Sequence, residues 1–171
     1  MALALLLAGC GGGDSSPTSP SGHNTSDPSS PSAPSNPSPS TAAIVQSIID
    51  LTNAQRSQAG IPALQVNAKL NTAAQLQADQ VAQLQILEHE IPGARYPTPP
   101  DRLAAAGYSW ASYGENLASG YATAADAVAG WMNSVGHREN ILNTTFTETG
   151  AGYATGSTGT MYYVQVFATP R

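Results

Sequence analysis

The chain has 171 residues, of which 41% are hydrophobic, and a formal net charge of −5. This length supplies one ordinary hydrophobic core, so we expect one folded domain. Its six Lys and Arg residues are scattered singly along the sequence. Without a basic stripe to neutralise phosphates, the chain is not expected to bind nucleic acid. Its single cysteine excludes an intrachain disulfide.

Residues 1–10 form a short apolar run that ends in small residues and the cysteine. A membrane-spanning helix needs about 20 apolar residues, so this run indicates the remnant of a secretory signal. Leu7-Ala8-Gly9-Cys10 resembles a bacterial lipobox, which predicts lipidation of Cys10 and a membrane as partner. We therefore predict an extracytoplasmic protein, either lipid-anchored, in the outer membrane of a Gram-negative cell, or secreted. The alternative is a small buried cysteine behind an apolar tail.

Residues 11–41 are mainly Ser and Pro, with almost no large apolar side chain. Such a segment cannot bury enough surface to offset the entropy of ordering, which predicts a disordered linker. The folded domain is then expected over residues 42–171.

The first part of this domain has the periodicity of amphipathic helices. Apolar residues recur at helical spacing over 44–52, and Gly60-Ile61-Pro62 ends this first helix. A second helix, rich in Gln and Ala, is predicted from Leu70 to about Leu87.

Helix-breaking Gly and Pro residues then alternate with short helices and strands. Four breakers predict a loop over residues 91–100, and a short helix over 101–106 is expected to end at Gly107. The aromatic residues of 108–113 favour a strand.

A third substantial helix follows Thr123, which resembles the first residue of a capping box with Asp126. Its apolar face runs to Val135, and Gly136 is interpreted as the residue just beyond its C-terminus.

The last part of the chain is β-prone. Strands are predicted over 146–154 and 161–167, and the Gly-containing connector 155–160 indicates a hairpin. Helices come first and strands late, without βαβ alternation, so the fold class is α+β or an α-β-α sandwich.

Three residues stand out for chemistry: His89, Glu115 and His137. Two imidazoles and a carboxylate are sufficient to hold zinc or another divalent metal with one position open. The same groups can transfer protons without a metal, because histidine titrates near neutral pH. Their spacing does not distinguish these two uses.

Each candidate also has a structural alternative. His137 follows the expected helix terminus, where it would stabilise the last carbonyl groups. Glu115 would satisfy backbone N–H groups in a turn. His89, between Glu88 and Glu90, would be a solvated, charge-paired ring.

Five motifs in order resemble the bacterial branch of the CAP superfamily, which has the SCP domain and includes cysteine-rich secretory, venom allergen 5 and pathogenesis-related 1 proteins. They cover essentially all of residues 42–171, and are Arg102-Leu-Ala-Ala-Ala-Gly-Tyr108, Gly114-Glu-Asn-Leu-Ala-Ser-Gly120, Trp131-Met-Asn-Ser-Val-Gly-His-Arg-Glu-Asn-Ile-Leu-Asn143, Phe146-Thr-Glu-Thr-Gly-Ala-Gly-Tyr-Ala154 and Tyr162-Tyr-Val-Gln-Val-Phe167.

The resemblance implies a three-layer α-β-α sandwich with a small central antiparallel sheet and a cleft lined by two histidines and two acids. Carried over by motif, His89, Glu115 and His137 are cleft residues, with His89 and His137 as metal ligands. The second acid of eukaryotic relatives falls on Ser134. A serine is neutral at pH 7, so the site lacks one negative charge that favours a dication.

Two functions follow as hypotheses. The first is a tethered lipoprotein that binds a small-molecule, lipid or envelope ligand in this cleft, with or without a divalent metal, and performs no chemistry. The alternative is a metal-assisted or general-base hydrolase of peptide, ester or envelope substrates, with Glu115 as base and His89 and His137 as ligands. Binding is favoured over catalysis, because no motif defines a nucleophile.

Overall fold

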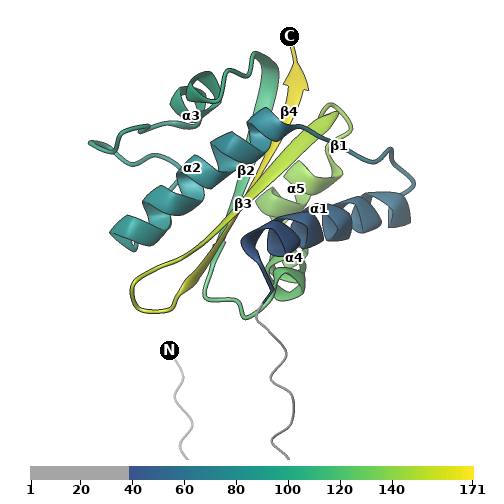
Figure 1. Ribbon diagram of the computed structural model, residues 1–171. Helices are drawn as coiled ribbons and strands as arrows, with labels where there is room; N and C mark the ends of the chain where they lie inside the picture. Colours follow the sequence, from purple (N-terminus) through teal and green to yellow (C-terminus); the bar gives the residue numbers. More distant parts are fainter. Residues whose placement is uncertain (1–38) are drawn as a thin grey trace, which may run out of the picture. The chain divides into compact units, whose positions relative to one another are not determined.

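The computed structural model describes residues 39–171, which form five helices and four strands (Figure 1). The helices are α1 (Thr41–Gln58), α2 (Ala68–Leu84), α3 (Pro99–Ala105), α4 (Ala124–Asn133) and α5 (Val135–Leu142). The strands are β1 (Gln65–Val66), β2 (Trp110–Ser119), β3 (Glu148–Thr155) and β4 (Met161–Pro170). The predicted lipidation site Cys10 and most of the predicted linker lie outside the described residues.

The four strands form one sheet in the order β1-β3-β4-β2. The three long strands are antiparallel, and β3 and β4 make the predicted hairpin, with Thr155 paired to Met161. The two-residue strand β1 pairs in parallel with β3, so the sheet is mixed rather than wholly antiparallel. Because β1 consists of two exposed residues, it carries no periodicity from which it could be predicted.

Helices cover both faces of this sheet, which confirms the predicted α-β-α sandwich (Figure 1). Alternate residues of β4 serve the two faces. Tyr163 and Phe167 pack with α1, α4 and α5, whereas Val164 and Val166 pack with α2 and α3. Within residues 39–171, no helix has the length and hydrophobicity needed to cross a bilayer.

Local residues explain where α2 and α3 begin and end. Helix α2 stops at Leu84, three residues before the predicted end, because Gln85 adopts a left-handed conformation with φ 55°. Helix α3 begins at Pro99 rather than at 101, since proline is favoured in the first turn. Thr98 and Asp101 form a complete capping box there, and Gly107 follows the helix at φ 70°, as predicted.

The prediction that Gly136 lies beyond a helix C-terminus is wrong. Helix α4 ends at Asn133, and Ser134, whose backbone is extended, is the C-cap residue of α4 and the N-cap residue of α5. Gly136 and His137 therefore lie in the first turn of α5. Arg138, one residue on, donates from Nη1 to the carbonyl of Met132 at 3.1 Å and so satisfies the end of α4.

Candidate functional site

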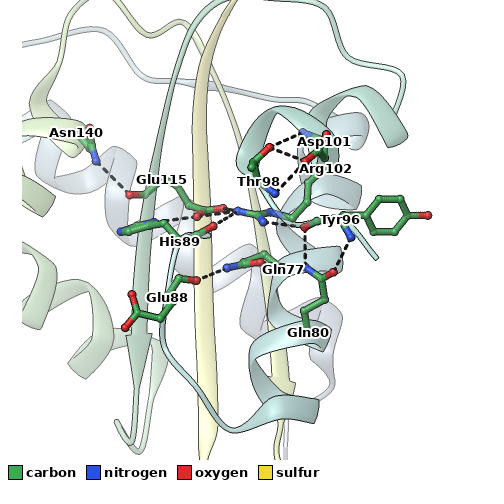
Figure 2. A network of polar contacts seen from close by, with 10 residues as sticks. All are labelled: Gln77, Gln80, Glu88, His89, Tyr96, Thr98, Asp101, Arg102, Glu115 and Asn140. Carbon is green, nitrogen blue, oxygen red and sulfur yellow. Dashed lines mark hydrogen bonds and ion pairs between the residues drawn. The ribbon is translucent and has the colours of Figure 1, made fainter. Parts of the chain in front are cut away.

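Glu115 is the centre of a buried polar network that joins three segments (Figure 2). It lies in β2, not in a turn, and its side chain is only 4% exposed. His89 Nδ1 lies 2.9 Å from Oε1. Since a carboxylate only accepts, we assign the hydrogen of the neutral ring to Nδ1, which leaves Nε2 as the acceptor.

Arg102 is the second partner of Glu115 and comes from α3. Its Nη2 lies 3.2 Å from Oε1 and 3.1 Å from Oε2 of the carboxylate, and the side chain is 1% exposed. The same Nη2 donates to the carbonyl of His89 at 2.9 Å, and Nη1 donates to the carbonyl of Tyr96 at 3.2 Å. One guanidinium therefore holds β2 and the loop after α2 together.

Helix α2 fixes this loop from the other side. Gln77, which is fully buried, donates from Nε2 to the carbonyl of Glu88 at 2.6 Å. Gln80 accepts from the backbone N–H of Tyr96 at 3.0 Å and donates to its carbonyl at 3.2 Å (Figure 2). The loop that carries His89 is thus bonded to α2 and α3, although the His89 side chain itself remains 51% exposed.

His137 is placed by a second set of bonds, between α5 and β2. Asn116 is fully buried and donates from Nδ2 to the carbonyl of His137 at 3.0 Å. Asn140 donates to Oδ1 of Asn116 at 2.9 Å and to the carbonyl of Glu115 at 3.3 Å. Gly114 permits this close approach, since a Cβ there would lie 2.8 Å from Oδ1 of Asn140.

The two histidines are driven toward opposite protonation states. The hydrogen bond to Glu115 raises the pKa of His89 above its usual value. Partial burial, followed by the positive charge of His89, lowers the pKa of His137. Position in the first turn of α5 acts in the same direction, because the helix N-terminus disfavours a cation. Because His137 lies near the N-terminus of α5, the alternative that it stabilises a helix C-terminus is wrong.

Ser134, the fourth predicted cleft residue, immediately precedes α5, three residues before His137. It lines an open groove of about 530 Å³ whose wall residues all fall within 120–134, among them Tyr121, Asp126 and Asn133. Neither histidine nor Glu115 contributes to that wall.

The residues fit a divalent metal poorly. Among residues 39–171, no group of three or more His, Cys, Asp and Glu side chains is arranged to hold a metal ion. Glu115 has Arg102 against both of its oxygens and His89 against one of them. A metal at His89 and His137 stays a prediction, with Glu115 unsuited as a third ligand.

A separate apolar groove of about 740 Å³ opens beside the start of α1 and α4 and the β3–β4 hairpin. Its wall is aliphatic and aromatic, and includes Ile44, Leu51, Ala124, Tyr153, Met161 and Tyr163. None of the predicted site residues lines it.

The sequence analysis missed the roles of Arg102, Asn116 and Asn140. Each of these residues stands in one of the motifs quoted above: Arg102 opens the first, Asn116 follows Glu115 in the second, and Asn140 follows His137 in the third. Their positions were visible, but their partners lie 13 to 25 residues away in the chain.

Curated relatives come from Bacillus subtilis. The chain is 36% identical over 126 residues to the uncharacterized protein YkwD, covering 73% of this chain and 48% of that one. It is 30% identical to the uncharacterized membrane protein YlbC, covering 71% and 33% of the two chains. The chain thus spans about half and a third of the lengths of these relatives.

Solved structures share the fold. An extracellular SCP-domain protein from Bacillus anthracis aligns with a TM-score of 0.69 and 30% identity, over 75% of this chain and 41% of that one. An outer surface protein from Borrelia burgdorferi aligns with a TM-score of 0.67 and 21% identity, over 74% of this chain and 92% of that one. A family model, that of the cysteine-rich secretory proteins, matches residues 49–167. Because that match spans most of the folded sequence, the chain belongs to the cysteine-rich secretory protein family, with its CAP domain.

Proposed function

We propose that the chain is an extracytoplasmic, membrane-tethered CAP-domain lipoprotein that binds an apolar ligand such as the acyl chain of a lipid. The observation that carries this proposal is the apolar groove beside α1 and α4. We assign the apolar part of the ligand to this groove rather than to the cleft that the sequence predicts at His89, Glu115 and His137.

The groove has the size and chemistry of a ligand site. Its volume of about 740 Å³ lies within the roughly 300–1,000 Å³ of typical small-molecule pockets. Ile44 and Leu51 on α1 line the groove together with Tyr153 and Met161 of the hairpin strands, and the lining is mainly apolar. Each methylene that leaves water here contributes about 0.8 kcal/mol, so a flexible hydrocarbon chain gains affinity with length.

Tethering brings such a domain close to a source of lipid. Acylation of Cys10 would anchor the chain to a membrane, and the linker would keep the domain near that surface. Labelling of growing cells with radioactive palmitate should mark the wild-type chain and not a Cys10→Ser variant. Equal labelling of the two proteins would show that Cys10 is not the lipidation site.

The groove is tested with a fluorescent fatty acid, cis-parinaric acid. Ala125 is exposed on α4 and lines the groove, so Ala125→Trp should fill it and weaken binding at least tenfold. The matched control is Ala104→Trp, an exposed alanine of α3 on the other face of the sheet, which should bind as the wild type does. Equal affinities for all three proteins would exclude the groove.

A second function, hydrolysis of ester, peptide or envelope substrates, is favoured by one observation. Glu115 holds Nδ1 of His89, which leaves Nε2 of an oriented imidazole for proton transfer. Both oxygens of Glu115 are already bonded to Arg102, so the carboxylate is not free to take a proton from a substrate. The histidines are then the proton-transfer groups, and Glu115 orients one of them. Turnover of envelope extracts that is equal in wild type and Glu115→Gln would exclude this function.

A further inference from the structure

We propose that Arg102 is a positioning residue that supplies the resident cation of the polar site and thereby keeps a divalent metal away from Glu115. The proposal is independent of the apolar groove. It rests on the contacts that the guanidinium makes with the carboxylate and with the His89 loop.

The first step is the charge at Glu115. Nη2 of Arg102 lies 3.1 to 3.2 Å from both carboxylate oxygens, and the two side chains are 1% and 4% exposed. In this buried setting little water screens the pair, so the guanidinium offsets much of the charge of the carboxylate. The rest of that charge acts on the His89 ring, which is hydrogen-bonded to Oε1.

The contacts around Glu115 also leave no room for a metal at its oxygens. Zinc binds a carboxylate oxygen at about 2.0–2.2 Å. With Arg102 against both oxygens and His89 Nδ1 against Oε1, a dication at that distance would meet a like charge. The described residues accordingly contain no group of three metal-ligating side chains.

The third step is that packing alone does not explain Arg102. Its Nε is buried without a hydrogen-bond partner among the described residues, which is a cost that a hydrophobic side chain would avoid. Replacing a whole buried ion pair by apolar residues is often neutral or stabilising. Arg102 instead positions His89 in two ways. It donates to Glu115, which holds the ring, and it donates to the backbone carbonyl of His89.

The wild-type protein provides the first test. Zinc is titrated into the full chain at fixed neutral pH, while carbon NMR follows the side-chain carboxyl of Glu115 and calorimetry measures affinity. We expect the Glu115 signal to stay in place and Glu115→Gln to bind zinc within twofold of wild type. The double variant His89→Ala/His137→Ala controls for zinc bound elsewhere on the chain. A Glu115 signal that moves with zinc at the imidazoles, or a tenfold loss in Glu115→Gln, would overturn the proposal.

The second test removes the cation. Arg102→Met should free the carboxylate and raise zinc affinity at least tenfold, and Arg102→Met/Glu115→Gln should abolish this gain. Arg102→Lys, which keeps the charge, should show no gain. A merely structural arginine would not produce a gain that depends on Glu115. A folded Arg102→Met protein without the gain would contradict the proposal, and if that variant does not fold, the wild-type measurement decides.

Discussion

Two buried arginines hold opposite sides of this domain, and their partners differ in kind. Arg56 in α1 and Arg102 in α3 are each 1% exposed. Arg56 donates to backbone carbonyls, at 2.8 Å for Pro62, 2.8 Å for Ile141 and 2.9 Å for Asn143. Arg102 donates to two carbonyls and to the carboxylate of Glu115.

Because their partners differ, the two arginines have different roles: Arg56 stabilises the fold, and Arg102 belongs to the candidate site. Arg56 satisfies the carbonyls at the C-terminal end of α5, where the backbone has no intrahelical donors, and burial lowers its pKa because no carboxylate compensates for lost water. Arg102 has a charged partner that in turn holds a half-exposed histidine. Arg56 therefore only stabilises the fold, because it bonds to backbone carbonyls alone. Arg102 bonds to a carboxylate as well, and so also affects the charge of the site at the surface.

Removal of Arg102 should have the largest effect. Arg102→Met leaves Glu115 buried without its counter-charge, so the free energy of unfolding at pH 7 should fall by about 4 kcal/mol. Protonation of the carboxyl would remove this unpaired buried charge, so the deficit should shrink as pH falls. Urea denaturation at several pH values measures both effects.

The control is a double-mutant cycle. Adding Glu115→Gln to Arg102→Met should restore part of the lost stability, because the buried charge is gone. Strictly additive losses would contradict a direct pairing of the two side chains.

Removal of Arg56 should cost less and respond differently to pH. Arg56→Met leaves several buried carbonyls without donors, which should lower the free energy of unfolding by about 3 kcal/mol. Carbonyl groups do not titrate, so this deficit should stay constant between pH 5 and 8. A deficit that shrinks at low pH, as for Arg102→Met, would erase the distinction between the two arginines.

Most of the fold was predictable because periodicity and breakers are local signals. The hairpin at 155–160 and the end of α3 at Gly107 follow directly from glycine positions. The break at Ser134 was not predictable, since the apolar face of α4 continues to Val135, and only the extended backbone at Ser134 divides the two helices. The parallel strand β1 is set by its partner β3, which lies some 80 residues away.

The site was predictable only in part. His89 and Glu115 are in contact, whereas the family resemblance implied only that both line one cleft, and their spacing of 26 residues could not establish the contact. Arg102 stood in the first motif, yet a single arginine among scattered charges gives no sign that it is buried. Ser134 was assigned by motif position alone, and it lines an open groove to which neither histidine contributes.

Gly114→Ala should have a smaller effect, at the contact between β2 and α5. In Gly114→Ala, the added methyl would lie 2.8 Å from Oδ1 of Asn140 and 3.0 Å from Cζ of Phe146. Such overpacking should cost about 1.5 kcal/mol and displace α5. NMR should show shifted His137 ring signals, with those of His89 nearly unchanged because Arg102 and α2 hold its loop. Equal shifts at both histidines would show that the site moves as one unit.

The smallest effect is the pH dependence of the two histidines, which have opposite signs. The pKa of His89 is raised in the folded state by Glu115, so its contribution to stability is present below about pH 6.5 and is lost as pH rises through the folded value. The pKa of His137 is lowered, so its neutral form favours folding above about pH 6.5 and that stability is lost as pH falls.

In wild type these contributions partly cancel, and single variants separate them. Comparison of wild type with His89→Gln by urea denaturation from pH 5 to 8.5 should show wild type gaining roughly 0.5 kcal/mol or less at the acid end, because the half-exposed ring is screened by solvent. His137→Gln should reverse the sign, since it removes the group that resists protonation. A His89→Gln profile parallel to wild type would mean that Glu115 does not raise the pKa of His89, and the coupling between the two side chains would then be absent.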